Sequence, residues 1–193
     1  MSGLEAGLRD RLIQAGAELV ARGDGAAVSL REIARRAGVS HGAPRRYFPT
    51  HLELLSAIAR QGFADLAAEL GEAAAGSRDD PRSRLAALSR AYLDFAASNR
   101  GMYELMFRHD LLESSRLGLR EVSLPLFRMV TALVSDAKPR TDADPEAVTG
   151  ALWSNLHGIA QLWGWGSLQL ATGLADVEPL LRAALDAHLG PER

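Results

Sequence analysis

The chain has 193 residues, of which 47% are hydrophobic, so it is long enough and apolar enough to bury a core. It contains no cysteine, which excludes disulfides, thiolate metal sites, iron–sulfur clusters and a cysteine nucleophile, and which suits the reducing cytoplasm. The net charge is −2. Residues 1–60, the head, carry nine arginines against six acidic residues, whereas residues 61–193 carry 13 basic against 18 acidic residues. The excess of positive charge in the head points to an anionic partner there.

No stretch of roughly 18 residues is apolar enough for a membrane-spanning helix. The N-terminus, with Glu5, Arg9, Asp10 and Arg11, lacks the apolar core of a signal peptide. We therefore expect a protein that has no contact with a membrane and stays in the cytoplasm.

Apolar residues recur at spacings of three and four, and β-branched residues are sparse, so the chain is predicted to be all-α with about nine helices. A first helix is expected at about 4–22, ending at the breakers of residues 23–25. Ser29 and Glu32 have the spacing of a capping box, which predicts a second helix from about residue 30. Gly38 then predicts a tight turn, and Ser40 is expected to cap a third helix over about 41–48.

Further helix boundaries follow from capping residues and prolines. Thr50 with Glu53 predicts a long helix to about residue 74. Asp-Pro pairs predict helix starts near 81 and 145. Between them, residues 99–101 should break one helix and begin another that ends at about 109, and a segment over about 113–137 should be kinked at Pro125. A last helix is expected over about 176–189.

Residues 29–49 read Ser-Leu-Arg-Glu-Ile-Ala-Arg-Arg-Ala-Gly-Val-Ser-His-Gly-Ala-Pro-Arg-Arg-Tyr-Phe-Pro, and they resemble the DNA-binding segment of the TetR/AcrR family of one-component transcriptional regulators. The resemblance is close over residues 8–58. It implies a three-helix helix-turn-helix domain at 1–50 whose third helix enters the major groove. It also implies a larger helical domain at 51–193 for effector binding and dimerisation.

Arg45 and Arg46 are the strongest candidates for DNA contacts, because a guanidinium binds guanine through two hydrogen bonds or clamps a phosphate. Where the family usually has Tyr, His and Lys, this chain has Arg45, Tyr47 and His51. The family's usual phosphate contacts therefore do not carry over directly to these three positions. The serines are explained equally well as helix caps. The predicted DNA-binding residues are Ser29, Arg31, Ser40, His41, Gly42, Ala43, Pro44, Arg45, Arg46, Tyr47 and His51.

Most aromatic residues lie beyond residue 60, which is typical of an apolar effector site but also of an ordinary core. His157 lies on an otherwise apolar helix stripe, as either a hydrogen-bonded core residue or a ligand contact. The spacing Trp153-x-x-x-His157-Gly158 looks like the TetR subgroup named for Trp, His and Gly. The predicted effector-binding residues are Phe63, Phe95, Tyr103, Met106, Phe107, Phe127, Trp153, Asn155, His157 and Gln161.

These observations predict a ligand-responsive transcriptional regulator. We expect a repressor that binds a palindromic operator in double-stranded DNA as a homodimer, joined through its last two helices, and that a small apolar or amphipathic effector releases. The sequence indicates no cofactor and no metal. Two alternatives stay open: the C-terminal domain binds a protein partner instead of a small molecule, or the protein activates transcription.

An enzyme is disfavoured. The sequence has no glycine-rich phosphate loop, no G-x-S-x-G and no H-E-x-x-H motif, and its five histidines are scattered without the spacing of metal ligands.

Overall fold

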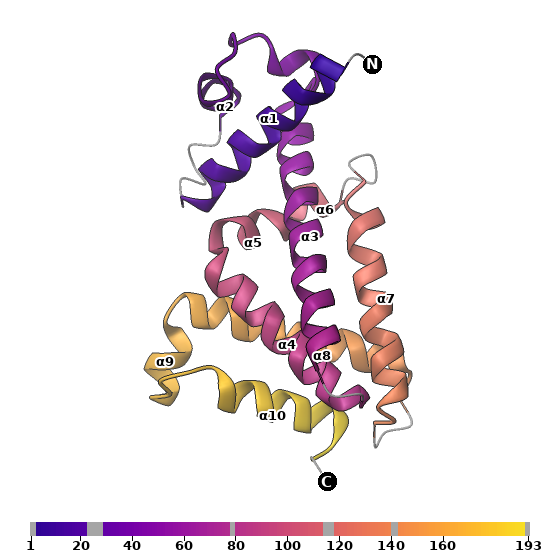
Figure 1. Cartoon of the computed structure of the whole chain (residues 1–193). Helices are drawn as coiled ribbons and strands as arrows, with labels where there is room; N and C mark the ends of the chain where they lie inside the picture. The colour runs from indigo at the N-terminus through magenta and orange to yellow at the C-terminus, as the bar shows by residue number, and fades with distance from the viewer. Residues whose placement is uncertain (1–2, 23–28, 78–79, 114–117, 140–142, 192–193) are drawn as a thin grey trace. The chain divides into compact units, whose positions relative to one another are not determined.

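The computed structural model describes residues 3–22, 29–77, 80–113, 118–139 and 143–191. Within these residues there are ten α-helices, one short 3-10 helix and no β-strand (Figure 1). The prediction of an all-α chain is confirmed. The chain divides into two compact units, one made of Met1–Asp65 and Asn99–Ser123, the other of Leu66–Ser98 and Leu124–Arg193.

The first unit starts with three helical elements that share a core. They are α1 (Gly3–Ala21), α2 (Leu30–Arg36) and the first part of α3 (His51–Gly76), with the 3-10 helix η2 (Pro44–Arg46) between the last two. Gly16 of α1 lets two side chains approach the helix closely, because a Cβ there would lie 2.3 Å from Ile58 Cδ1 and 3.5 Å from Ile33 Cδ1. Leu12 and Leu54 of the same unit are fully buried. This core fixes α2 and η2 on α1.

Helices α5 (Arg100–Met106) and α6 (His109–Glu113) and the start of α7 (Arg120–Asp136) complete the first unit. Helix α5 packs on α1, where a Cβ added to Gly101 would lie 2.1 Å from the carbonyl oxygen of Val20. On α3, Gly62 leaves room for the sulfurs of Met102 and Met106, each 2.7 Å from where its Cβ would be. Two glycines therefore allow α5 to lie directly against backbone.

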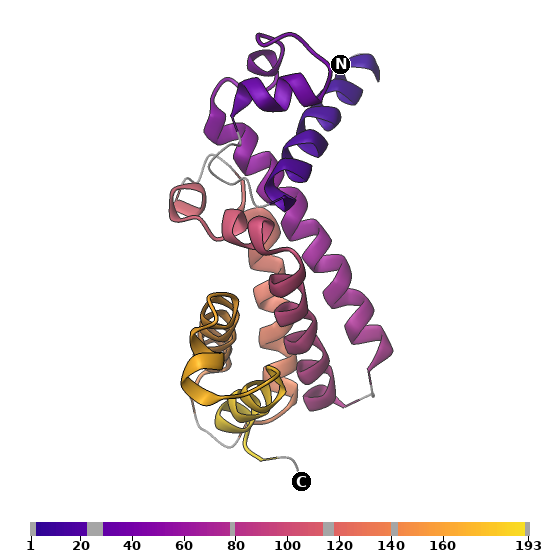
Figure 2. The same cartoon turned by 90° about the vertical axis from the view of Figure 1, so that its left-hand side faces the viewer.

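The second unit contains the end of α3, α4 (Pro81–Ser98), most of α7, α8 (Pro145–Gly164), α9 (Ser167–Thr172) and α10 (Glu178–Leu189). Helices α4, α8 and α10 pack against one another, and α9 packs against α8 (Figure 2). The guanidinium of Arg82 on α4 donates to Asp186 and to the Gly190 carbonyl at the end of α10, and Arg90 pairs with Glu178 at its start. Both ends of α10 are thus tied to α4.

The predicted helix starts are confirmed by their caps. The Thr50 hydroxyl accepts from the Glu53 N–H at 3.2 Å at the start of α3. The carboxylates of Asp80 and Asp144 each accept a backbone N–H at 2.9 Å, where prolines open α4 and α8. Pro125 lies inside α7, and the kink expected there stays a prediction.

The third helix expected over 41–48 with a Ser40 cap is wrong. Residues 41–42 form a turn, and the only helical residues described there are the three of η2, which Pro44 begins and which has no side-chain cap bond. The reason is that proline has no N–H, so Pro44 cannot donate the bond that an α-helix starting at Ser40 would need. Most of the backbone bonds that do form join residues three apart, such as Tyr47 to Pro44 at 3.0 Å, and one joins residues four apart, from Phe48 to Pro44 at 2.8 Å.

Two short helices were not expected, α6 and α9, so the described chain has one α-helix more than the nine predicted. Helix α9 has six residues and lies between two glycines with positive φ, Gly166 and Gly173, a length too short for periodicity to show. Helix α5 ends at Met106 instead of 109, and α7 starts at Arg120 instead of 113. The breakers at 23–25 and residues 114–117 lie outside the described residues. No helix in the described part is both long and apolar enough to cross a membrane.

Candidate functional site

The turn after α2 has the geometry of a helix-turn-helix. Gly38 has a φ of 69°, and its N–H donates to the Arg35 carbonyl while the N–H of Val39 donates to the Ala34 carbonyl. These two bonds form a Schellman motif, in which a left-handed glycine ends the helix and redirects the chain. The tight turn predicted at Gly38 is confirmed, and it directs the chain away from α2 toward η2.

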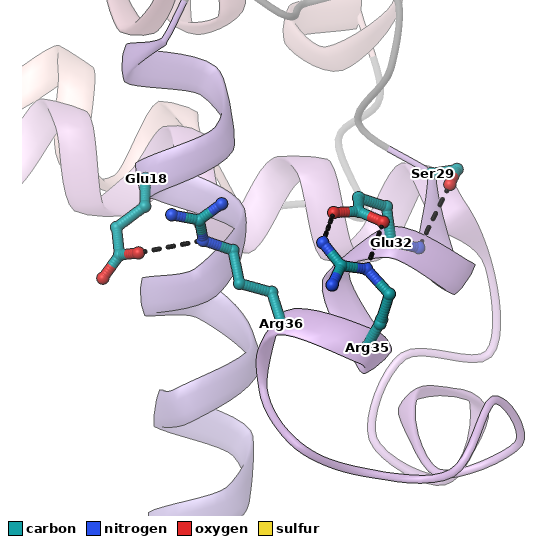
Figure 3. Close-up of polar contacts among 5 residues, drawn as sticks. All are labelled: Glu18, Ser29, Glu32, Arg35 and Arg36. Atoms are coloured by element: carbon teal, nitrogen blue, oxygen red, sulfur yellow. Dashed lines mark hydrogen bonds and ion pairs between the residues drawn. The ribbon is translucent and has the colours of Figure 1, made fainter.

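Arg35 and Arg36 of α2 are engaged in ion pairs within the first unit (Figure 3). Arg35 donates two bonds to the Glu32 carboxylate, at 2.8 and 2.5 Å, and these bonds lower the pKa of Glu32. Arg36 donates to Glu18 of α1 at 3.0 Å. The Ser29 hydroxyl accepts from the Glu32 N–H at 3.2 Å, so the first half of the predicted capping box forms, while the Glu32 carboxylate, expected to reach back, lies on Arg35.

The arginines of η2 differ from Arg35 and Arg36 in their pairing. Arg45 and Arg46 are exposed, as is Arg31 on α2, and none of the three guanidinium groups pairs with another group among the described residues. Exposed cationic groups that have no ion-pair partner among the described residues suit a polyanion.

The other predicted DNA-binding residues lie around this surface. Exposed residues are Ser29, Ser40, His41, Gly42 and His51, and half-buried residues are Ala43 and Tyr47. Pro44 is buried and serves the packing of the turn. Arg9 of α1 lies over the ring of Phe48 at 5.3 Å from its centroid, a contact that fixes the end of the turn on α1. This contact was not predictable from the sequence, because no local spacing links residues 9 and 48.

Four predicted effector-binding residues belong to the first unit and pack together. Phe63 and Phe107 make an edge-to-face pair at 5.6 Å, and Tyr103 lies 4.9 Å from Phe107. Tyr103 and Met106 are buried. Their contacts are those of a packed core at the junction of α3 and α5.

Three residues of the second unit share hydrogen bonds between α4 and α8. The Tyr92 hydroxyl lies 3.0 Å from Nδ1 of His157 and accepts from Nε1 of Trp153 at 3.3 Å. Since an indole N–H only donates, the Tyr92 hydrogen is available to His157, which favours a neutral imidazole with its proton on Nε2. Burial lowers the pKa of His157 and favours the same neutral form.

This network gathers two of the predicted effector-binding residues and one that was not predicted. Trp153 keeps 42% of its surface exposed, and its ring lies 5.9 Å from that of His157. Tyr92 was missed as a site residue because sequence periodicity puts it on the apolar face of α4 but does not say which helix that face meets. A partly exposed ring beside a polar pair, of which Tyr92 is buried and His157 half-buried, has the composition of a small-molecule site.

The remaining predicted effector-binding residues are dispersed over the second unit. Phe95 is buried, while Phe127 and Gln161 are half-buried. Asn155 is exposed, and its amide lies 3.5 Å from Nε2 of His188 on α10, away from the Tyr92 network. No group of three or more acidic residues or histidines in the described residues is placed to hold a metal ion.

The turn, the unpaired arginines and the helical body define a helix-turn-helix transcriptional regulator. The family model described as bacterial regulatory proteins, tetR family, matches residues 12–58. The model of the tetracyclin repressor-like C-terminal domain matches residues 85–188. The chain belongs to the TetR family of DNA-binding transcription regulators. Its assignment to the subgroup named for Trp, His and Gly stays a prediction.

Solved structures agree with this family. A protein with unknown function from Rhodococcus sp. RHA1 is 30% identical, with a TM-score of 0.79 over 94% of this chain and 93% of that chain. The putative regulatory protein SCO4313 is 25% identical, with a TM-score of 0.73 over 97% and 98%. RolR in complex with resorcinol is 20% identical, with a TM-score of 0.70 over 100% and 92%, a likeness that shows the fold. The comparison with curated proteins gives no match.

Proposed function

We propose that this regulator is a homodimeric repressor that binds a palindromic operator and leaves it when a small apolar or amphipathic molecule binds. The observation that carries the proposal is that Arg45 and Arg46 of η2, together with Arg31, have no ion-pair partner among the described residues, whereas Arg35 and Arg36 are paired internally. It acts in the cytoplasm, where operator DNA is accessible to it. The functional division at residue 50, with DNA binding before it and effector binding after it, is part of the same proposal.

DNA binding is assigned to the surface around η2. Arg45 and Arg46 supply base or phosphate contacts, and the small exposed Gly42 lets the backbone approach the groove. The Schellman turn at Gly38 and the ion pair of Arg36 with Glu18 hold this surface on α1. A single short turn buries little surface, so two copies on two half-sites are needed for specific binding.

Dimerisation is assigned to α8 and α10, since regulators of this family dimerise. The outward stripe of α8 has small residues, Ala147, Ala151, Ser154 and Gly158, and a Cβ at Gly158 would meet nothing within 4 Å in this chain. On α10, Pro179, Ala183 and Ala187 are exposed at helical spacing. Small side chains on both helices allow the close helix approach that a four-helix interface requires.

Effector binding is assigned to the surroundings of Trp153 and His157. RolR, a structural neighbour, was solved with resorcinol, a small aromatic molecule that carries hydroxyl groups. A ring of that kind suits stacking on a partly exposed indole and a hydrogen bond to the Tyr92 and His157 pair. The effector class proposed is thus apolar with at least one polar group.

The route from effector to DNA runs along the chain from α4 to α5. Tyr92 lies on α4, and α4 passes through Asn99 into α5, whose Gly101 rests on the Val20 carbonyl of α1. A shift of α4 would therefore move α5 and, with it, α1 of the head, in addition to any shift of the continuous helix α3. The effector releases DNA only if it binds the misaligned state more tightly, because equal affinity for two states changes nothing.

The DNA-binding part is tested by anisotropy titration of DNA from the flanks of the coding region at several salt concentrations. We expect Arg45→Ala and Arg46→Ala to weaken selective binding by about 1–3 kcal/mol where the side chain contacts a base, and to lower the salt slope by about 1 where it contacts a phosphate. Arg128→Ala, an exposed arginine of α7, is the matched control and should bind like the wild type. Unchanged binding by both head variants contradicts the assignment.

The effector part uses the same assay with a panel of small aromatic and aliphatic compounds. Release by one compound, lost in Trp153→Ala while DNA binding persists, is the expected result. Selective DNA binding that no compound changes would instead favour the alternative in which the C-terminal domain binds a protein partner.

A further inference from the structure

Residues 147–175, which cover α8 after its first turn and all of α9, include no charged residue. Between Glu146 and Asp176 the sequence contains no Asp, Glu, Lys or Arg, although α8 and α9 both lie partly at the surface of the second unit. Four large apolar side chains of this segment are exposed, Trp153 and three that follow it closely in sequence: Leu162 at 39%, Trp165 at 61% and Leu170 at 90%. Isolated exposed apolar residues are ordinary, but three within nine positions and without a neighbouring charge form a patch.

The patch is held in place by the structure of α9. Gly166 and Gly173, with φ values of 77° and 71°, form the two ends of the helix. The Gln169 amide donates to the Trp163 carbonyl at 3.1 Å, and the Thr172 hydroxyl accepts from the Leu174 N–H at 3.3 Å. These bonds fix residues 165–174, which we call the α9 arm, at the end of α8 (Figure 2). Leu170 therefore points outward from a hydrogen-bonded helix.

The patch continues the outward stripe of α8. Gly158, Leu162 and Trp165 follow one another at helical spacing, so the small residues proposed for the dimer lead directly to the large ones of the arm. In a two-fold interface each copy offers the same surface to the other. This surface has small side chains at one end and large side chains at the other. Such a surface can pack against the same surface of a second copy.

The absence of charge also argues against other occupants. An interfacial membrane segment usually adds lysine or arginine that binds anionic lipid, and this arm has neither. The centre of a protein interface, in contrast, is depleted of charge and enriched in aromatic residues.

We propose that the α9 arm is a clasp that a second copy of this chain covers, with Trp165 and Leu170 as its anchors. The clasp extends the dimer interface beyond α8 and α10. It rests on the proposed dimer, and it adds that a helix of six residues, not the main helix pair alone, sets how tightly the two copies hold.

The first test is the dimer dissociation constant, measured by sedimentation equilibrium of the full chain. Leu170→Ser should raise it at least tenfold while leaving the circular dichroism spectrum unchanged, because Leu170 makes few contacts within its own chain. Leu124→Ser, which changes a leucine of α7 that is 44% exposed, is the matched control and should leave the dissociation constant unchanged. An unchanged dissociation constant for Leu170→Ser overturns the clasp.

The second test uses the lack of cysteine in the chain. In Leu170→Cys the only thiol should react with a thiol reagent more slowly as protein concentration rises through the dissociation constant, whereas in Leu124→Cys the rate should not depend on concentration. A rate for Leu170→Cys that does not change while the protein dimerises overturns the clasp and leaves the dimer intact. A wild type that stays monomeric at all concentrations overturns the proposed dimer itself.

The lipid alternative is tested by co-sedimentation with phosphatidylcholine vesicles. We expect no binding above that of Leu170→Ser. Vesicle binding that Leu170→Ser abolishes, together with an unchanged dissociation constant, overturns the second copy as the occupant.

Discussion

The head and residues 147–175 differ in their content of charged side chains. In the head, Arg35 and Arg36 are neutralised by Glu32 and Glu18, while Arg31, Arg45 and Arg46 have no ion-pair partner among the described residues. Between Glu146 and Asp176 there is no charged side chain at all, and the polar groups of Trp153 and His157 meet at one tyrosine. The distribution of unpaired charged side chains therefore distinguishes the two surfaces. It favours phosphates at the head and apolar partners at the second surface.

Single substitutions should be able to destabilise one of these two regions without affecting the other. In the head the vulnerable feature is backbone geometry, because glycines carry the turn and the contact with α5. In the second unit it is a hydrogen-bonded network.

Gly101→Ala should have the largest effect. Its Cβ would lie 2.1 Å from the Val20 carbonyl oxygen, and neither backbone can rotate away as a side chain would. We expect a loss of stability at the upper end of about 1–3 kcal/mol, measured as the urea midpoint. Gly71→Ala in α3 meets nothing within 4 Å and should instead gain up to about 1 kcal/mol. Equal midpoints for the two variants would contradict the close approach of α5 to α1.

Tyr92→Phe should come next. It removes the hydroxyl that Trp153 and His157 share and leaves their ring nitrogens without that partner. We expect a loss of about 1–2 kcal/mol, since water reaches the partly exposed indole and replaces part of the bond. Tyr47→Phe in the head is the control and should change the urea midpoint little. A Tyr92→Phe protein as stable as the wild type would show that the network adds no stability.

Gly38→Ala should cost about 1 kcal/mol, because alanine adopts the left-handed φ of 69° at a penalty even though its Cβ meets no atom within 4 Å. Gly42→Ala, four residues on and outside the left-handed region, should be neutral or stabilising by up to about 1 kcal/mol. Thermal melting of both variants checks the difference. If Gly42→Ala melts lower than Gly38→Ala, the Schellman turn does not carry the geometry of the head.

The smallest effect is a pH dependence of stability through His157. Burial lowers its pKa in the folded chain below the value of about 6.5 for an exposed histidine, so the unfolded chain binds the proton first as the pH falls. The contribution to stability is complete above about pH 6.5 and is lost below it, down to the lower folded pKa. We expect a loss under about 1 kcal/mol, because the ring is only half-buried. Urea midpoints between about pH 8 and pH 5 should fall less in His157→Asn than in His41→Asn.

The head was largely predictable from sequence because its signals are local. Ser29, Thr50 and Gly38 act on the backbone within three or four residues, and the structure confirms each of them. The failure there was Pro44, where the pattern of a capped helix was followed without giving enough weight to the missing N–H. One absent donor converts a two-turn α-helix into three residues of 3-10 helix.

The second unit was predictable as helices but not as a site. Tyr92 and His157 are 65 positions apart, and nothing in either helix says that they meet. Helical periodicity identifies the apolar face, while the pairing of faces depends on tertiary packing. For the same reason Phe63, Tyr103 and Phe107, chosen as effector contacts, are found packed on one another.

The contact of Gly101 with Val20 bears on the construction of hybrid regulators. Joining the first 50 residues of this chain to the effector domain of another regulator would keep η2 and its arginines, but it would remove the one residue type that fits over the end of α1. In a hybrid joined at residue 50, α1 would therefore pack on a helix of the other regulator instead of on α5. Transplanting Met1–Asp65 together with Asn99–Ser123 would preserve the native contact of α5 with α1 and would move one compact unit as a whole.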